Sequence, residues 1–217
     1  TDHTYALALK WSGVDFMSAK VAYERLNRSA KHEIGTTLFA TDQATANVVE
    51  NYIRRFDTAP MERDTYKASV DIYPLDTLSF GLHYKNKKSK YTDTVLGLKE
   101  DKANEYVIDA DWKASSLISL NGYAEYDETK ASQVQRYSLP AGTLDPNVAG
   151  SANNYNWKVV NKDKTYNYGA GAEVYAIPKK LTFKLQYDYT KSDGLADFSF
   201  FDYTPAETGD QLNWDDY

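Results

Sequence analysis

The chain has 217 residues and a net charge of −6, with a mean hydropathy of −0.64. It contains 19 Tyr, 8 Phe and 4 Trp but no Cys, which favours strands and excludes disulfides, thiolate metal sites and covalent c-type haem attachment in this chain. No apolar run approaches the ~20 residues of a membrane-spanning helix, and the acidic balance gives no support to nucleic-acid binding.

Alternating apolar and polar residues, separated by turn signals, predict β-hairpins from the first residues onward. The first hairpin has strands at 5–11 and about 16–23, with Ser12-Gly13 as the turn. The second is the clearest, because 66–72 and 78–84 both alternate strictly around a turn at 74–77.

Two further hairpins follow the same scheme. Their strands lie at 106–112 and 118–126, and at 166–174 and 181–189, with turns at 114–116 and 177–179. This gives about eight strands of roughly 9–11 residues, the length that crosses a bilayer when tilted. We therefore expect residues 1–217 to form part of a single transmembrane antiparallel up-and-down β-barrel domain.

The connections are very short within hairpins and long and polar between them, at 27–62, 86–103, 127–164 and from 190 onward. Short turns on one side and long loops on the other are typical of outer-membrane barrels. Within the first long loop, Val48, Val49, Tyr52 and Ile53 fall at helical spacing and predict a short helix at 41–56. Residues 213–217 do not alternate and are interpreted as loop.

Aromatic residues mark both ends of the predicted strands. Two such belts with aliphatic residues between them match the interfacial girdles of a barrel. A soluble β-sandwich or β-rich binding module is the alternative, but it explains neither the belts nor the loop asymmetry. The predicted interface aromatics are Tyr23, Tyr66, Tyr84, Tyr106, Tyr126, Tyr166 and Tyr189 at the long-loop ends, and Trp11 and Trp112 at the short-turn ends.

The alternation also assigns a set of residues to the inside of the barrel, where charges of both signs would line the lumen. Glycines in this set would let a neighbour approach the wall closely. We find no convergent catalytic groups and predict neither an enzyme nor a metal site. The predicted lumen-lining residues are Lys67, Asp71, His83, Lys85, Asp109, Asp111, Glu125, Gly169, Gly171, Glu173, Lys184 and Asp188.

Acidic residues cluster late in the chain. A solvated acidic loop is the favoured interpretation, and a divalent-cation site in an extracellular loop is the alternative. The cluster consists of Asp193, Asp197, Asp202, Asp210, Asp215 and Asp216.

Several segments, in this order, resemble the MtrB/PioB family of outer-membrane proteins associated with decahaem cytochromes. They are RRFDTA (54–59), RDTYKASVDIYPLDTLSFGLHY (63–84), YTDTVLGLKEDKANEY (91–106) and IPKKLTFKLQYDYTKSDG (177–194). Barrels of this family have several times as many strands, so the resemblance implies that the chain is an internal portion of one.

The resemblance implies a non-catalytic role in the bacterial outer membrane. The barrel would sheath a periplasm-facing multihaem c-type cytochrome in its lumen, with an extracellular multihaem cytochrome as a further partner at the long loops and lipid and lipopolysaccharide around it. Haem would belong to the partner, not to this chain. An open or gated porin is the alternative function.

Overall fold

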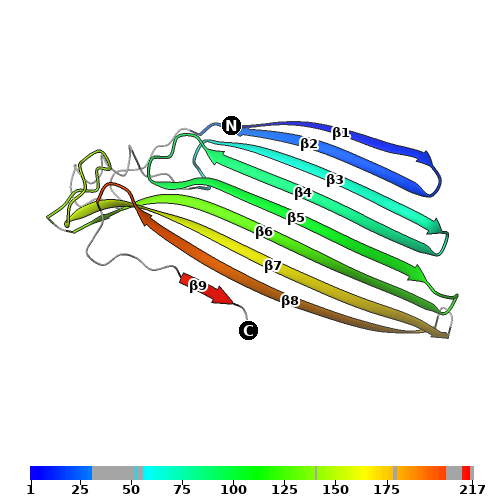
Figure 1. The fold of residues 1–217 in the computed structure, drawn as a ribbon. Coiled ribbons are helices and arrows are strands. Elements are labelled where there is room, and N and C mark those ends of the chain that lie inside the picture. The colour runs from blue at the N-terminus through cyan, green and yellow to red at the C-terminus, as the bar shows by residue number, and fades with distance from the viewer. Residues whose placement is uncertain (31–51, 53–55, 140, 178–179, 204–211, 216–217) are drawn as a thin grey trace.

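The computed structural model describes residues 1–30, 52, 56–139, 141–177, 180–203 and 212–215. They form one antiparallel sheet whose nine strands are neighbours in sequence order. Figure 1 shows β1 to β8 side by side, with the hairpin turns after β1, β3, β5 and β7 at one end (the turn end) and the other connections at the opposite end (the loop end). The strands are β1 (Asp2–Val14), β2 (Met17–Arg28), β3 (Met61–Leu75), β4 (Leu78–Tyr91), β5 (Gly97–Lys113), β6 (Ile118–Ser138), β7 (Asn154–Ile177), β8 (Leu181–Phe200) and β9 (Leu212–Asp215).

The expected fold class, an all-β antiparallel up-and-down sheet, is confirmed. Among the residues described, none belongs to a helix long and apolar enough to cross a membrane. The predicted helix at 41–56 falls almost entirely on residues outside the described ranges.

Strict alternation gives the sheet two unlike faces. Val70 lies opposite Leu82, and Leu82 opposite Ile108, so that apolar side chains meet from strand to strand on one face, here called the outer face. These side chains are not buried: Ile108 is 57% exposed and Leu185 74%. A soluble sheet would cover such a surface, whereas a barrel wall turns it towards lipid. The opposite, inner face is polar.

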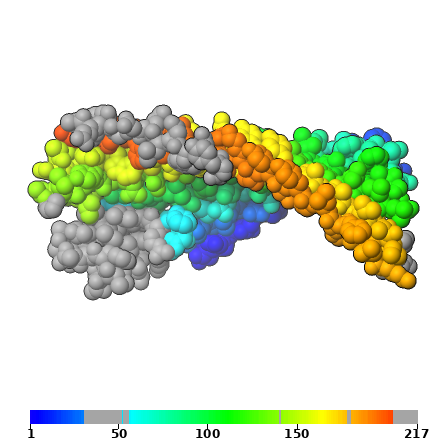
Figure 2. Space-filling model, turned by 90° about the horizontal axis from the view of Figure 1, so that it is seen from below, coloured from blue at the N-terminus to red at the C-terminus, as the bar shows by residue number. Residues whose placement is uncertain are grey.

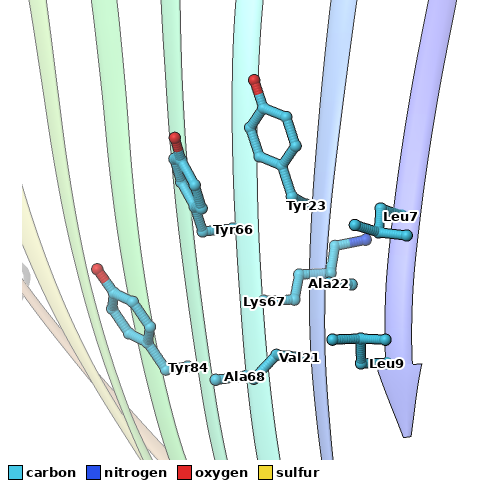
Figure 3. A pocket seen from close by; sticks show the side chains of 9 residues that line it. All are labelled: Leu7, Leu9, Val21, Ala22, Tyr23, Tyr66, Lys67, Ala68 and Tyr84. Atoms are coloured by element: carbon cyan, nitrogen blue, oxygen red, sulfur yellow. The ribbon is translucent and has the colours of Figure 1, made fainter.

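A row of tyrosines crosses the outer face near the middle of the long strands. Neighbouring rings are in contact, with centroid distances of 5.0 Å for Tyr23–Tyr66, 4.9 Å for Tyr84–Tyr106 and 5.0 Å for Tyr126–Tyr166. Figure 3 shows that the hydroxyls of Tyr23, Tyr66 and Tyr84 point towards the loop end, above a shallow apolar hollow of about 320 Å³. We call this row the tyrosine belt; it comprises Tyr23, Tyr66, Tyr84, Tyr106, Tyr126, Tyr166, Tyr168 and Tyr189.

Trp11 and Trp112 lie at the other edge of the apolar surface, towards the turn end, and each is 47% exposed. From Trp112 to Tyr106 the outer face of β5 is apolar over six residue steps, about 20 Å at ~3.3 Å per residue.

The strands are longer than the sequence predicts, and three of the expected loops are wrong. Residues 86–91 and 97–103 extend β4 and β5, residues 127–138 and 154–164 extend β6 and β7, and β8 continues to Phe200. The long-loop interpretation failed because these extensions are polar on the outer side, so they lack the apolar alternation of the hairpins. The connections that remain are 29–60, 92–96, 139–153 and 201–211.

Two smaller expectations also differ from the structure. The first hairpin turns at Asp15-Phe16 instead of Ser12-Gly13, because a register shift between Trp11 and Val14 carries β1 further. Residues 212–215 form the short strand β9, which pairs with 193–196 of β8, although 213–217 were expected to be loop.

Beyond the tyrosine belt, towards the loop end, the inner side of the sheet becomes apolar and the outer side becomes charged. On the inner side the rings of Tyr137 and Tyr155 lie 5.0 Å apart and those of Trp157 and Phe198 5.7 Å apart, and Val159 is buried. On the outer side the intervening positions carry lysines and carboxylates, as Lys158, Lys162 and Lys164 do on β7. The loop end is therefore organised like a water-exposed sheet.

A small core and the side chain of Arg136 hold this loop end together. Met61 and Tyr91 are buried with Ala59, and Leu26 and Leu98 pack against them. The Arg136 guanidinium donates to the carbonyls of Thr143 and Val148 at 2.9 Å each, which fixes the 139–153 connection over the outer side.

In the view turned by 90°, β8 (orange) crosses the molecule diagonally because the sheet twists (Figure 2).

Candidate functional site

The inner face between the tyrosine belt and the turn end is the candidate site. Its residues lie in rows, because residues directly opposite one another on neighbouring antiparallel strands fall at one height. One row crosses seven strands from β2 to β8 and holds three of the predicted carboxylates. We call it the carboxylate row; it consists of Ser18, Asp71, Gly81, Asp109, Tyr123, Gly169 and Asp188.

Each carboxylate of this row is in contact with a hydroxyl, an imidazole or an amide group. Ser18 Oγ donates to Asp71 Oδ2 at 3.2 Å, and His83 Nε2 lies 2.9 Å from Asp109 Oδ1. The Tyr123 hydroxyl donates to Asp188 Oδ1 at 3.0 Å, and Gln186 Nε2 donates to the same oxygen at 3.0 Å. These contacts orient the carboxylates, and no lysine or arginine takes part in them.

The two predicted glycines lie beneath side chains of their neighbours. A Cβ atom at Gly169 would collide with the ring of Tyr123 and with the Asp188 carboxylate, and one at Gly171 would collide with Asn121 and Gln186. The close approach expected at these glycines is therefore made by the wall's own side chains. The Tyr123 ring passes over Gly169 to reach Asp188 on the strand beyond.

A second row lies nearer the turn end. Asp111, Asn121, Gly171 and Gln186 are opposite one another. Beyond them Lys184 Nζ forms an ion pair of 2.5 Å with Glu173, which also accepts a 2.8 Å hydrogen bond from the Tyr175 hydroxyl. These side chains line a polar hollow of about 250 Å³ in the wall.

A third row lies at the height of the tyrosine belt. Lys67, Lys85, Glu105 and Asp127 are opposite one another, and Lys85 pairs with Glu105 at 2.8 Å. Asp127 lies one residue beyond Tyr126, outside the membrane-spanning part of β6. Burial, and then the neighbouring Glu125 and Glu105, raise the pKa of Asp127 to about 6.

The predicted inner residues thus lie together on one wall with an excess of negative charge. They include six carboxylates and three lysines, and two of the lysines, Lys85 and Lys184, are already paired with acids. The wall offers polar contacts, favours cations, and disfavours lipid. Within the described ranges, no group of three or more His, Cys, Asp or Glu side chains could hold a metal ion.

The late acidic residues do not gather at one point of the described structure. Asp193 and Asp197 lie on the outer side of β8, whereas Asp202 accepts the backbone N–H of Asn156 at 2.6 Å and pairs with Arg136 at 3.4 Å. Asp215 lies in β9 opposite Asp193. Asp210 and Asp216 are outside the described ranges.

Sequence reasoning missed several residues of this region, Ser18, Asn121 and Gln186 among them. Tyr123, Glu105 and Asp127 belong to the inner rows, and Tyr168 belongs to the tyrosine belt, where its ring lies 6.5 Å from that of Tyr189. Period-two alternation alone would have found Tyr123, because Tyr123 and Glu125 are two residues apart and therefore lie on the same side of β6. Asp127 was assigned to a loop, and Glu105 lies just before the strand predicted at 106–112.

Comparison with known proteins gives two findings. The family model for outer membrane β-barrel porins of the MtrB/PioB type matches residues 1–217. The outer membrane protein MtrB of Shewanella baltica (strain OS185) is 23% identical over 158 residues, which cover 71% of this chain and 21% of that relative. The chain thus matches about a fifth of the length of this curated relative.

Proposed function

Because the chain belongs to the MtrB/PioB family of outer-membrane β-barrel proteins, we propose that it forms part of a barrel that sheathes a multihaem c-type cytochrome. The sheath supports electron transfer across the outer membrane. Electrons pass between haems of the partner, and the barrel itself is not an enzyme. A further multihaem cytochrome at the loop end is a second proposed partner.

The observation that carries this proposal is the contrast between the two faces at membrane depth. The outer face presents exposed Leu, Ile and aromatic side chains, while the inner face presents rows of carboxylates and amides oriented by hydrogen bonds. A polar protein cannot lie in lipid without losing the hydration of its surface groups. A barrel closed from a wall with these two faces replaces lipid with polar contacts and satisfies its own backbone groups.

An open or gated porin is the second candidate function. The family description itself uses the word porin, and an unoccupied lumen with an excess of carboxylates would favour cations. The two functions differ in what fills the lumen. Haem content and ion conductance therefore separate them.

The test uses the full-length protein, tagged and extracted from its native outer membrane in mild detergent. A visible spectrum and a haem-stained gel report the cytochrome, and conductance in planar bilayers reports an open pore. We expect a haem-positive partner at fixed stoichiometry and little conductance. A colourless, conducting barrel from cells that express their cytochromes would refute the sheath and support the porin.

A matched pair of variants locates the contact. The variant Asp71→Asn/Asp109→Asn/Asp188→Asn neutralises the carboxylate row, and we expect it to retain several-fold less haem per barrel. The control Glu62→Gln/Glu128→Gln/Asp193→Asn removes the same number of charges from the outer side beyond the tyrosine belt and should retain haem normally. Equal haem retention by the two variants would show that the carboxylate row is not part of the partner interface.

A further inference from the structure

Four lysines occupy one row on the outer side of the sheet, just beyond the tyrosine belt. Lys88 lies opposite Lys102, Lys102 opposite Lys130, and Lys130 opposite Lys162. The row therefore crosses β4, β5, β6 and β7 without a break. We call it the lysine row. It stands out in a chain whose net charge is −6.

The lysine row keeps a constant distance from the tyrosine belt. Each lysine lies four residues from the belt tyrosine of its own strand: Lys88 from Tyr84, Lys102 from Tyr106, Lys130 from Tyr126 and Lys162 from Tyr166. An even spacing puts lysine and tyrosine on the same side of a strand. Four residues span about 13 Å along a strand, and less along the membrane normal because barrel strands are tilted.

Such a row is unfavourable unless an anion covers it. Like charges directly opposite one another on neighbouring strands destabilise a sheet. Among the residues that the structure describes, the carboxylate that pairs with the row is Glu100, which lies 3.2 Å from Lys88 and 2.9 Å from Lys102. Neither Lys130 nor Lys162 forms an ion pair within the described ranges.

The height of the row identifies the anion. Belt tyrosines mark the headgroup level of the membrane, and the loop end is the extracellular side of an outer-membrane barrel. The surface that surrounds the lysine row is therefore the headgroup region of the outer leaflet. The glycolipid of this leaflet is lipopolysaccharide, and its phosphates are the anionic groups at this height. The lysine ammonium groups attract such phosphates at an anionic membrane surface.

We propose that Lys88, Lys102, Lys130 and Lys162 form a binding site for the phosphate groups of the outer-leaflet glycolipid. The site fixes the height of the barrel in the membrane and neutralises the repulsion within the row. It depends on the placement of the barrel in the outer membrane but not on a cytochrome in the lumen, so the two proposals fail separately.

The test compares glycolipid bound to the full-length protein and to two variants after extraction in mild detergent. The row variant Lys102→Gln/Lys130→Gln/Lys162→Gln removes most of the site. The control Lys10→Gln/Lys20→Gln/Lys158→Gln removes the same charge: Lys10 and Lys20 are opposite each other on the inner side, and Lys158 lies eight residues from Tyr166, about 26 Å along the strand. Mass spectrometry reports the glycolipid per barrel.

We expect the row variant to retain at least tenfold less glycolipid than wild type, and the control to retain the wild-type amount. In vesicles of phosphatidylethanolamine alone, the row variant should unfold at a temperature no lower than wild type, since repulsion has been removed. Adding lipopolysaccharide to the vesicles should raise the unfolding temperature of wild type and control only.

Three results would overturn the proposal. The first is equal glycolipid retention by the row variant and wild type. The second is an equal loss from the control, which would make the effect one of total charge. The third is full stabilisation of the detergent-solubilised protein by inorganic phosphate alone, which would make the row a general anion site and not a lipid site.

Discussion

At the scale of single residues, the inner wall depends on side chains that reach across a glycine. Tyr123 donates to Asp188 two strands away, and its ring passes over Gly169 on the strand between them. An aromatic ring over a glycine in a sheet covers backbone that the missing side chain would leave open. The glycine is therefore required by a neighbouring side chain of the wall itself.

Substitution of this glycine should destabilise the barrel. In Gly169→Ala the new methyl group collides with Tyr123, and overpacking of this kind costs about 1–3 kcal/mol. We expect a lower unfolding temperature, measured by the heat-dependent shift of the full-length protein on gels. Gly122→Ala is the control, because its Cβ would lie 3.4 Å from the nearest atom, the Gly169 carbonyl oxygen. An equal effect at both positions would contradict the role of Tyr123.

Asp127 should make stability depend on pH in an unusual direction. Its pKa is raised from 3.8 to about 6, so the folded protein binds the proton more tightly than the unfolded chain. The contribution of Asp127 therefore favours folding below the unfolded pKa and is lost as the pH rises from about 4 to about 6. We expect Asp127→Asn to remove this dependence from the urea midpoint of the full-length protein and to raise the midpoint at neutral pH.

Asp64 is the matched control with the opposite sign. A hydrogen bond from Tyr23, followed by contacts with Arg25, lowers the pKa of Asp64 below 3.8. Its contribution is present above that value and is lost as the pH falls further. Asp64→Asn should therefore lower the urea midpoint at neutral pH. A rise in both variants would show that general charge repulsion, and not these local contacts, sets the response.

At the scale of strands, the sequence predicts the faces well and the lengths poorly. Period-two alternation assigned Lys67, Asp109 and Asp188 to one side of the sheet, because the pleat fixes the side of every second residue. It failed beyond the tyrosine belt, where the apolar residues change to the inner side and the outer side is charged. A polar segment such as 127–138 has no lipid-facing alternation, although its backbone is fully paired with β7.

The rows of the inner wall and the lysine row were beyond sequence reasoning for another reason. A row depends on the register between strands, and hairpin turns fix that register only locally. The register shifts between Trp11 and Val14 and between Leu98 and Glu100 could not be read from composition. Lys88, Lys102, Lys130 and Lys162 are scattered in the sequence and meet only in the sheet.

The extended strands should be visible in hydrogen exchange. Amides of 128–137 and 155–164 are paired between β6 and β7, so we expect them to exchange slowly in the full-length protein, and more slowly than amides of the 139–153 connection, whose hydrogen bonds are isolated turn contacts. Mass spectrometry of peptic fragments gives the measurement. Equally fast exchange of 128–137 and 141–150 would contradict the extended strands and restore the long loop.

At the scale of the whole molecule, the sheet has a direction in the membrane. The short turns, the two tryptophans and the rows of the inner wall lie towards one end, and the extended strands lie towards the other (Figure 1). In outer-membrane barrels the short turns face the periplasm. The lysine row and the proposed cytochrome sheath both require this orientation.

This chain contains no Cys, so single cysteines introduced into it test the orientation by labelling in whole cells, in a full-length protein from which any cysteines outside this chain have been removed. Val148→Cys lies in an exposed connection at the loop end, and we expect a membrane-impermeant maleimide to label it in intact cells. Asp76→Cys lies in the turn between β3 and β4 and should react only after the outer membrane is permeabilised. Leu82→Cys, in the apolar band, should resist the reagent in both cases. Labelling of Asp76→Cys but not Val148→Cys in intact cells would show that the barrel has the opposite orientation. The lysine row would then lie on the periplasmic side, where the outer-leaflet glycolipid cannot reach it.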